Sequence, residues 1–361
     1  MTHQLFDQTQ IVNVNDYEAY AKNTLDPAVW AYFSGAAGDE ISQQRNLNAW
    51  RDLSLQPRVL SHLCTLNTET TIIGRTISHP IFIAPFAFQK LLHPQGETAC
   101  AYASAVLEAG FVLSDQSSID PIAVANTYLP EKDRGLLWHQ LYWTDDRARI
   151  AKRLNEIEQA GYEAIVLTVD APVHGARDRE RRAGFKLPQG IQFRPTPSSA
   201  NRTLESLLST TPNWDDVAWL VETAKLPVLI KGILHPGDAQ LAQSSGCAGI
   251  IVSNHGGRVL DTVIPTAWVL SEIRQAVGDS IHILVDGGIR RGTDILKAIA
   301  LGADAIMIGK PAAMALGAKG PEGVAHIIRL LWDELKLAMV LTGCLNLKNL
   351  PSDLVHINQS H

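Results

Sequence analysis

The 361-residue sequence lacks the features that mark membrane and exported proteins. No apolar run approaches the roughly 18 residues that a transmembrane helix needs. The opening residues MTHQLFDQTQ do not form a signal peptide, and the C-terminal residues 358–361 do not form a peroxisomal targeting signal. We therefore expect a cytoplasmic protein that does not contact a membrane.

Charge, cysteine and histidine content exclude further classes. The formal net charge of −6 disfavours a nucleic acid as the main partner. The cysteines have no paired spacing typical of a zinc site or a redox dithiol, and the histidines are isolated from one another, so we expect no metal. The cysteines are predicted to be free thiols in a reducing compartment; they are Cys64, Cys100, Cys247 and Cys344.

The apolar residues, 46% of the chain, are arranged in a repeating order. From residue 80, short apolar runs alternate with stretches whose apolar residues lie three and four apart, such as 99–109 and 150–160. The runs are too apolar to be half-exposed strands, which favours a parallel sheet. Eight strand–helix units predict an α/β fold, the (β/α)8 or TIM barrel. The eight runs are 80–84, 111–113, 136–141, 164–169, 227–230, 248–252, 281–285 and 303–308.

The remaining segments are predicted to belong to the same domain, residues 1–361. Residues 1–79 should form a cap on the barrel, with helices at 14–22 and 27–33 followed by a turn-rich stretch. The barrel itself is expected to span residues 80–345, and residues 346–361 to form a C-terminal tail.

One long irregular segment interrupts the barrel pattern. Residues 187–213 contain several prolines and a stretch rich in serine and threonine, which indicates a loop. Loops of this length are commonly active-site lids or disordered insertions, and the sequence is compatible with both.

Polar residues follow the predicted strands. In a (β/α)8 barrel the C-terminal strand ends meet at one mouth, where the chemistry of such proteins takes place. A single polar strand end is common and needs no functional explanation, but a whole set directed at one mouth predicts a site. The set comprises Ser114, Gln140 with Tyr142, Thr168 with Asp170, Lys231, Ser253 with Asn254 and His255, Asp286 and Lys310.

The segment SNHGGRVLD at 253–261 is the most informative of these ends. Its histidine, His255, can exchange a proton near neutral pH, and its arginine, Arg258, can bind a carboxylate with two parallel hydrogen bonds. The alternative is a turn whose charges face water. The polar ends of the other strands favour the active-site interpretation.

The last two strand ends indicate a phosphate site. The segment DGGIRRGTD at 286–294 has glycines that let backbone N–H groups approach a ligand, and Arg290 or Arg291 adds positive charge. Thr293 is expected to cap the helix that follows. Gly309–Lys310 ends the next strand, and loops seven and eight of these barrels commonly bind phosphate. Because the dinucleotide fingerprint is absent, FMN fits better than a nicotinamide dinucleotide.

With these segments in place, the chain resembles the FMN-dependent (S)-2-hydroxy acid oxidase and dehydrogenase family, which includes glycolate oxidase, lactate oxidase and mandelate dehydrogenase. The resemblance extends from about residue 14 to about residue 344 and rests on several separate motifs. These are YFSGA at 32–36, IAP at 83–85, HPQGE at 93–97, QLY at 140–142, LTVD at 167–170, KG at 231–232, SNHGGRVLD at 253–261 and DGGIRRGTD at 286–294.

The resemblance implies oxidation of an (S)-2-hydroxy acid to the 2-oxo acid. His255 would be the base, while the C2 hydrogen and its electrons pass to flavin N5 by hydride transfer or through a carbanion. Asp170 would stabilise the imidazolium, and Tyr142 would hydrogen-bond the reacting oxygen. Lys231 would stabilise negative charge near flavin N1.

The resemblance also implies two sets of binding residues. Arg177 and Arg258 would hold the substrate carboxylate together with the hydroxyl of Tyr32. Gln116 stands where glycolate oxidase has a pocket tryptophan, which would admit a larger or more polar substrate side chain. Lys310 stands where the family usually has arginine, so it would bind phosphate as a point charge. The residues implied to hold FMN are Pro85, Phe86, Ala87, Ser114, Gln140, Thr168, Lys231, Ser253, Asp286, Gly287, Gly288, Arg290, Gly309 and Lys310.

The electron acceptor follows from two comparisons within the family. Ala87 matches the oxidases, and the loop 187–213 is shorter and less apolar than the insertion that anchors membrane-bound relatives. We therefore expect an oxidase that passes electrons to O2 and yields H2O2. A soluble dehydrogenase, a lactate 2-monooxygenase-like enzyme and, more distantly, an FMN-dependent isomerase are the alternatives. The resemblance further implies a homo-oligomer, a tetramer or an octamer.

Overall fold

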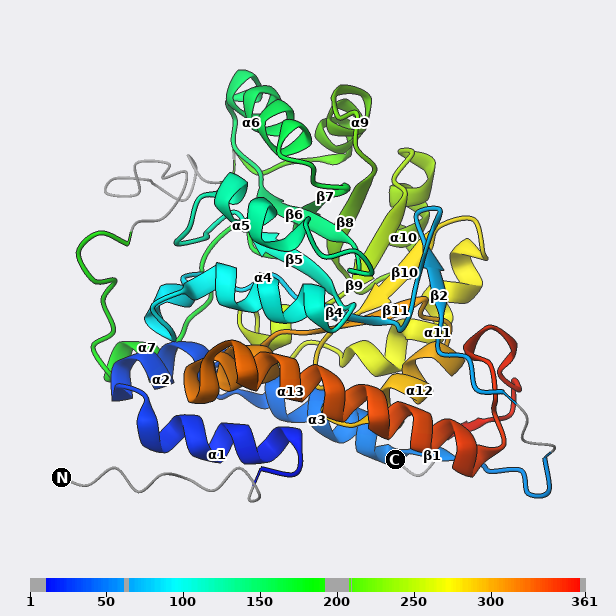
Figure 1. Ribbon diagram of the computed structural model, residues 1–361. Helices are drawn as coiled ribbons and strands as arrows, with labels where there is room; N and C mark the ends of the chain where they lie inside the picture. The colour runs from blue at the N-terminus through cyan, green and yellow to red at the C-terminus, as the bar shows by residue number, and fades with distance from the viewer. Residues whose placement is uncertain (1–10, 62–64, 192–207, 209, 358–361) are drawn as a thin grey trace.

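The computed structural model describes residues 11–61, 65–191, 208 and 210–357. Its centre is a closed barrel in which every neighbouring pair of strands is parallel (Figure 1). Each strand overlaps one of the eight predicted apolar runs, so the predicted (β/α)8 barrel is confirmed. The strands are β4 (Ile81–Ile83), β5 (Gly110–Ser114), β6 (Leu137–Tyr142), β7 (Ala164–Thr168), β8 (Val228–Ile233), β9 (Gly249–Val252), β10 (His282–Val285) and β11 (Ala305–Ile308).

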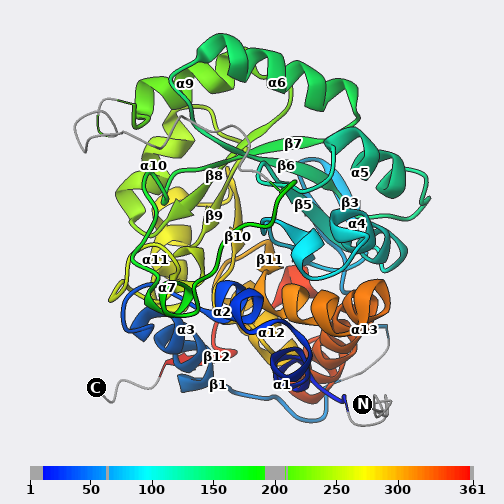
Figure 2. The same cartoon turned by 90° about the vertical axis from the view of Figure 1, so that its left-hand side faces the viewer.

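Helices follow the strands and surround the barrel (Figure 2). In α6, for example, Ile150, Leu154 and Ile157 are buried at spacings of four and three residues, and Asp146 caps the first turn through the backbone N–H of Arg149. The outer helices are α4 (Gly96–Val106), α5 (Pro121–Tyr128), α6 (Arg147–Gln159), α9 (Trp214–Thr223), α10 (Pro236–Ser244), α11 (Thr266–Val277), α12 (Gly292–Ala300) and α13 (Lys310–Thr342).

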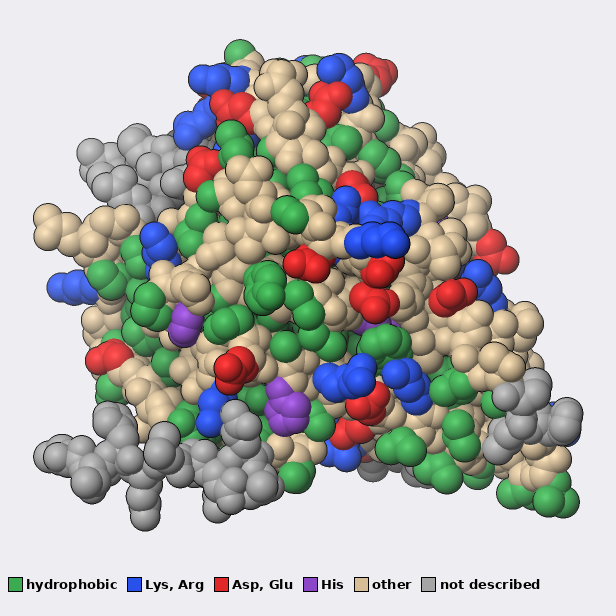
Figure 3. Space-filling view, viewed as in Figure 1, with side chains coloured by type: hydrophobic (Ala, Val, Ile, Leu, Met, Phe, Trp, Pro, Cys, Tyr) green, Lys and Arg blue, Asp and Glu red, His purple; other side chains and the backbone are tan. Residues whose placement is uncertain are grey.

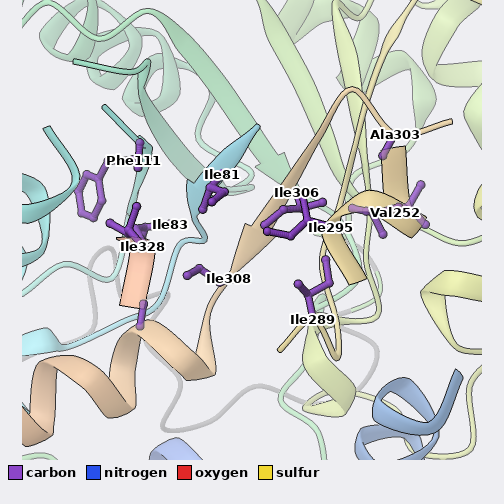
Figure 4. Close-up of a cluster of buried hydrophobic side chains, with 14 of the residues drawn as sticks. Ile81, Ile83, Phe111, Val252, Ile289, Ile295, Ala303, Ile306, Ile308 and Ile328 are labelled. Carbon is purple, nitrogen blue, oxygen red and sulfur yellow. The ribbon is translucent and has the colours of Figure 1, made fainter. Parts of the chain in front are cut away.

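Both faces of the barrel strands are buried, which explains why the runs are apolar without interruption. In β4, Phe82 belongs to the cluster inside the barrel, whereas Ile81 and Ile83 belong to the cluster between the barrel and the helices. Figure 4 shows part of this outer cluster, in which Ile295 of α12 and Ile328 of α13 also take part.

The N-terminal helices pack on the barrel as a cap. Asn13 begins α1 (Val14–Thr24) with a capping box, and Asp26 followed by Pro27 begins α2 (Pro27–Ser34). These two helices confirm the helices predicted at 14–22 and 27–33. Helix α1 lies along α13 (Figure 1).

A third cap helix, α3 (Ile41–Asp52), was not predicted. Its buried residues are Ser42, Asn46, Ala49 and Trp50, two of which are polar, so the apolar periodicity of the segment is weak. The polar residues are buried because they contact the functional end of the barrel, as shown below.

Among the described residues, four short strands lie outside the barrel sheet, three before it in the sequence and one after it. Strand β1 (Leu53–Leu55) pairs antiparallel with β12 (Val355–Ile357), so the C-terminal segment returns to the cap. The hairpin β2 (Thr70–Ile72) and β3 (Arg75–Ile77) adds two isoleucines to the cluster inside the barrel, and the backbone N–H of Ile73 donates to Nε2 of His282 at the start of β10. The hairpin therefore closes the N-terminal end of the barrel and leaves the other end open for a site. Short 3-10 helices are η2 (Gln89–Leu91), η4 (His255–Gly257) and η5 (Leu347–Asn349).

The predicted cap of α12 is wrong. The helix begins at Gly292, and the carboxylate of Asp294 accepts the backbone N–H groups of Arg290 and Arg291 at 2.9 and 3.0 Å. Thr293 lies inside the first turn and cannot act as the capping residue. The aspartate at the third helical position already supplies an acceptor for the backbone groups that precede the helix.

Three further features concern the predictions about membrane contact, charge and cysteines. In the part of the chain that the structure describes, no helix combines the length and apolar character needed to cross a membrane. Basic and acidic side chains lie intermingled on the face seen in Figure 3. Cys100, Cys247 and Cys344 are buried free thiols, whereas Cys64 lies outside the described residues.

Candidate active site

A cavity of about 830 Å³ lies at the C-terminal end of the barrel strands, in the upper part of the ~300–1,000 Å³ range typical of small-molecule sites. Most of the predicted site residues line it. These are Tyr32, Pro85, Phe86, Ala87, Ser114, Gln116, Tyr142, Thr168, Arg177, Lys231, His255, Arg258, Asp286, Gly287, Gly288, Arg290, Gly309 and Lys310. The other three, Asp170, Gln140 and Ser253, lie behind the wall and are bonded to His255, Ser114 and Lys231 respectively.

His255 and Asp170 form a hydrogen-bonded pair. The imidazole Nδ1 lies 2.9 Å from Oδ1 of Asp170, and both side chains are largely buried. Because Nδ1 faces a carboxylate, it carries the proton of the neutral ring, and Nε2 is the acceptor. Burial works to raise the pKa of Asp170, but His255 and Lys231 outweigh it and lower this pKa, so the carboxylate stays ionised.

The loop geometry allows this pair to form. His255 has a φ of 55°, which an L-residue adopts only when its surroundings hold it there. Its backbone N–H donates to Oγ of Ser253 at 3.1 Å. On the other side, Gly232 has a φ of 115°, and a Cβ there would lie 2.6 Å from Cβ of Asp170. A side chain at the glycine of the KG motif would therefore prevent Asp170 from occupying the position in which it bonds His255.

Arg258 is held by the end of α2. Its Nη1 donates to the backbone carbonyls of Tyr32 and Gly35, both at 2.7 Å, and its guanidinium lies 5.2 Å from the ring centroid of Tyr32. Burial, and then the charge of Arg177, lower the pKa of Arg258 to about 10, which leaves it charged at neutral pH. The direction of the guanidinium is thus fixed by the cap.

Arg177 and two tyrosines complete the cationic part of the cavity. Nε of Arg177 donates to the backbone carbonyl of Arg258 at 3.4 Å. Burial raises the pKa of Tyr32 despite the opposing charges of Arg258 and Arg177, and burial and then Asp170 raise the pKa of Tyr142. Both phenols keep their protons at neutral pH. Two guanidinium groups and two hydroxyl donors suit a carboxylate with an adjacent oxygen.

Lys231 is a buried cation beneath the cavity. Its Nζ donates to Oγ of Ser253 at 2.9 Å and lies 3.4 Å from Oδ2 of Asp286. Burial works to lower the pKa of Lys231, but Asp286 and Asp170 outweigh it and raise this pKa. Lys231 therefore carries a fixed positive charge at the wall.

A second cationic area lies at Arg290 and Lys310. Nζ of Lys310 donates to the backbone carbonyl of Ser34 at 2.9 Å and to Oε1 of Gln43. Burial, followed by the charges of Arg258 and Arg290, holds the pKa of Lys310 well below its usual range. An anion between the last two loops of the barrel would favour the protonated form of Lys310 and pair with Arg290, so this area suits a multiply charged group.

The glycines of the DGG segment have a second role that the sequence did not reveal. Gly287 and Gly288 both have a φ of 89°, and a Cβ on Gly288 would lie 2.4 Å from the backbone O of Asn46. Nε1 of Trp50 donates to the backbone carbonyl of Gly287 at 2.7 Å. These glycines admit α3 as well as a ligand.

Sequence reasoning missed the contribution of α3. Gln43, Asn46 and Leu47 line the cavity. Asn46 and Asn254 exchange two buried amide hydrogen bonds of 2.8 Å each, which joins α3 to the histidine loop. A signal was present, because Asn46 and Trp50 are four residues apart and share one face of a helix.

The loops after β6 and β7 add an apolar wall that was also not predicted. Trp143 lines the cavity and contacts Trp219 with ring centroids 5.8 Å apart, and Phe185 stacks on Tyr32 at 4.5 Å. Phe185 follows the short helix α7 (Asp178–Arg182), which lies against α2 (Figure 2).

The predicted lid, residues 187–213, is described only at its ends. Leu187 and residues 210–212 line the cavity. Residues 192–207 and 209 lie outside the described residues. Whether the segment acts as a lid stays a prediction.

The polar groups of the site fit FMN. Oε1 of Gln140 accepts from Oγ of Ser114 and from the backbone N–H of Asp115, while Nε2 of Gln140 and Oδ1 of Asp286 are buried and lack a partner among the described residues. An amide donor, a carboxylate and the Lys231 ammonium match the polar edge of a flavin and its ribityl hydroxyls. The second cationic area matches its phosphate. No group of three or more His, Cys, Asp or Glu side chains that could hold a metal occurs in the described ranges.

Comparison with known proteins agrees with this geometry. Residues 21–357 match the family FMN-dependent dehydrogenase. The chain belongs to this family. The resemblance inferred from the motifs is thereby confirmed, and so is FMN as the cofactor.

Individual relatives cover almost the whole chain. An L-lactate oxidase from Nostoc sp. is 40% identical in an alignment 362 positions long, which covers 96% of this chain and 98% of the relative. A glycolate oxidase from Spinacia oleracea is 39% identical in an alignment 353 positions long, which covers 94% of each protein. A crystal structure of mandelate oxidase has a TM-score of 0.87 and 36% identity, and the match covers 96% of this chain and 98% of that one.

Proposed function

We propose that this protein is an FMN-dependent oxidase that converts an (S)-2-hydroxy acid to the 2-oxo acid. The observation that carries the proposal is the meeting of a His255–Asp170 pair with Arg177 and Arg258 in one cavity whose donor set fits FMN. The names of the relatives, lactate, glycolate and mandelate oxidase, support the same substrate class.

The arginines bind the substrate carboxylate. Arg258 presents a charged guanidinium whose direction is fixed by the carbonyls of Tyr32 and Gly35. Arg177 approaches from the loop after β7, and the hydroxyl of Tyr32 can donate a further hydrogen bond. This grip sets the substrate's second carbon relative to His255.

His255 then acts as the base. Nε2 accepts a proton from the substrate, because Nδ1 already holds its own proton toward Asp170. The Asp170 carboxylate stabilises the imidazolium that results. If the proton comes from the hydroxyl, the C2 hydrogen leaves as a hydride; if it comes from C2, a carbanion results. The same base serves both routes, and the hydroxyl of Tyr142 hydrogen-bonds the reacting oxygen.

FMN supplies the acceptor of two electrons when it is bound. Lys231 keeps a positive charge at the cavity wall, which stabilises negative charge that develops nearby during the reaction. Gln140, Asp286 and Lys231 would hold the ring and the ribityl chain, and Arg290 and Lys310 would hold the phosphate.

We infer O2 as the final electron acceptor, with H2O2 as the product. Ala87, which lines the cavity, and the oxidase relatives support this choice. An isomerase would have no use for a carboxylate site built from two arginines. We further propose that residues 1–361 act as one domain, because α2 and α3 contribute residues to the barrel's site. The homo-oligomer and the cytoplasmic location stay predictions.

The experiment uses the yellow holoenzyme. Anaerobic mixing with (S)-lactate, glycolate and (S)-mandelate should bleach the visible flavin absorbance for at least one acid, and air should restore it with release of H2O2. The (R)-acids are the control. Fast reduction with slow recovery in air would indicate a dehydrogenase, and CO2 release with a shortened acid would indicate a monooxygenase. No bleaching by any 2-hydroxy acid would contradict the proposal.

A further inference from the structure

Glu97 is a fully buried carboxylate that the proposed reaction does not use. It lies in the first turn of α4, where the helix N-terminus favours a negative charge. Its Oε1 accepts three hydrogen bonds, from the backbone N–H of Gln89 at 3.1 Å and from the backbone N–H and Oγ of Ser118 at 2.7 and 3.0 Å. Its Oε2 is buried without a partner among the described residues. The side chain is thus held through one oxygen that receives three donors.

These donors belong to two different loops at the cavity. Gln89 belongs to the loop after β4, and Ser118 to the loop after β5. The two loops also bond directly, since the backbone N–H of Phe88 donates to the carbonyl of Gln116 at 3.1 Å and that of Lys90 donates to Oγ of Ser118 at 3.2 Å. Glu97 therefore lies at the junction of the two loops.

Both loops supply residues of the cavity wall. The loop after β4 supplies Phe86, Ala87 and Phe88, and the loop after β5 supplies Gln116. Gln116 is further fixed on its other side, because its backbone N–H donates to Oγ of Ser114 at 3.2 Å. A shift of either loop would move this wall relative to the substrate.

The loop after β4 is strained at Phe88, which precedes Gln89, a hydrogen-bond donor to Glu97. Phe88 has a φ of 55°, which is costly for a bulky side chain and persists only where neighbours hold it. The hydrogen bond from Gln89 to Glu97 fixes the next peptide group, and the ring of Phe88 is buried 6.2 Å from that of Tyr32. Loss of the bond would let Phe88 relax and displace Ala87.

We propose that Glu97 is a positioning residue that fixes the part of the substrate cavity formed by Phe86, Ala87 and Gln116. The role in substrate binding rests on the function proposed above. A charged oxygen receives three donors more strongly than an amide oxygen does, which explains a carboxylate at this buried position. Within this wall Gln116 is assigned to the substrate, whereas Phe86 and Ala87 are assigned to FMN. Displacement of Gln116 weakens substrate binding before and during the reaction alike, and therefore raises KM more than it lowers kcat.

The test compares two loop variants with a matched control. Glu97→Gln removes the charge. Ser118→Ala keeps the buried glutamate but removes one of its donors, together with the acceptor of the Lys90 N–H. Thr98→Val is the control, because it loses a hydroxyl hydrogen bond, to the carbonyl of Gln95 at 2.6 Å, in the same helical turn but without a bond to Gln89 or Ser118. Amide hydrogen exchange at Gln89 and Ser118 reports on the loops, and steady-state kinetics with (S)-lactate and (S)-mandelate report on the wall.

Glu97→Gln and Ser118→Ala should both speed exchange at these amides and raise KM about five- to tenfold, with kcat changed less than about twofold, as expected for one weakened hydrogen bond in a binding wall. Thr98→Val should leave the exchange and KM unchanged. Unaltered exchange, or faster exchange with an unaltered KM, would overturn the proposal. If Glu97→Gln does not fold, Ser118→Ala decides alone. If the wild type oxidises no 2-hydroxy acid, the proposed function fails, and exchange alone then supports or overturns the role of Glu97.

Discussion

The carboxylate of Asp261 accepts a 2.8 Å hydrogen bond from the backbone N–H of Ser42, and this bond joins the histidine loop to α3. The same carboxylate accepts the N–H groups of Asp39 and Ile41 at 3.0 and 3.3 Å. Glu40, the residue at the cap position, has no side-chain hydrogen bond of this kind. Helix α3 thus receives its cap from a residue of the motif that contains His255.

Replacing Asp261 by alanine should weaken FMN binding and lower stability. The loss of a helix cap costs about 1–2 kcal/mol, and a shifted α3 would move Asn46 away from Asn254. FMN affinity, measured by the recovery of free flavin fluorescence on dilution, should fall together with the unfolding midpoint. Asp279→Ala, at a fully exposed aspartate, is the control and should change neither. An unchanged FMN affinity in Asp261→Ala would contradict the coupling.

The contribution of Asp261 should depend on pH. Burial works to raise the pKa of Asp261, but hydrogen bonds from Ser42, Thr262 and Ile41 outweigh it and lower this pKa. A lowered folded-state pKa stabilises the protein above the unfolded value of about 3.9, and that stability is lost as the pH falls through the folded value. The difference in unfolding midpoint between wild type and Asp261→Asn should therefore be largest near neutral pH and shrink in acid. A constant difference would argue against the charge.

His255→Gln should keep FMN and lose catalysis. The cavity retains a side chain of similar length, but no group can accept the proton, so flavin reduction should slow roughly 10²–10⁴-fold. Anaerobic stopped-flow absorbance measures this rate, and the flavin-to-protein ratio shows that the cofactor is retained. Asp170→Asn should slow flavin reduction less, because His255 is still present as the base and only the charge that stabilises its imidazolium is lost. Reduction at the wild-type rate in His255→Gln would refute the assigned base.

Arg258→Lys should weaken substrate binding although the charge is kept. Nη1 of Arg258 donates to the carbonyls of both Tyr32 and Gly35, and the guanidinium has further N–H groups for the substrate; a lysine has only one nitrogen for both tasks. Loss of one or two charged hydrogen bonds predicts a fall in kcat/KM of roughly 10–100-fold. Arg179→Lys is a matched control, since Arg179 of α7 pairs with Glu40, donates to Oγ of Ser34 at 3.3 Å and does not line the cavity. Equal effects of both substitutions would speak against a specific role for Arg258.

Lys231→Met should destabilise the protein as well as slow the reaction. The substitution leaves Asp286 buried without its cation, and breaking a buried pair of this kind costs about 3–5 kcal/mol. Thermal unfolding of the flavin-free protein should show the loss. Adding Asp286→Asn should recover part of the stability but not the rate, because the fixed positive charge is still missing. Full stability of Lys231→Met alone would mean that the pair is unimportant for folding.

Much of the barrel and most of its site residues follow from local sequence. A strand buried on both faces must be apolar throughout, so runs such as 164–169 and 248–252 mark the strands directly. In a parallel barrel every strand ends at the same mouth, so Lys231 and His255 could be assigned to one site before their distance was known. Apolar periodicity also located helices α1 and α2.

The tertiary structure alone decided how these residues are supported. Asn46 meets Asn254 across 208 positions of the chain, and Glu97 meets Ser118 across 21, contacts that no local pattern encodes. The cap prediction for Thr293 was wrong for a related reason. Thr293 and Asp294 are adjacent and both residue types can cap a helix, and the backbone geometry decides that Asp294 accepts the N–H groups. Hydrophobic periodicity is set by which face of an element is buried, and so it is written in neighbouring residues. Partners of buried polar groups depend instead on how the closed barrel brings distant loops together.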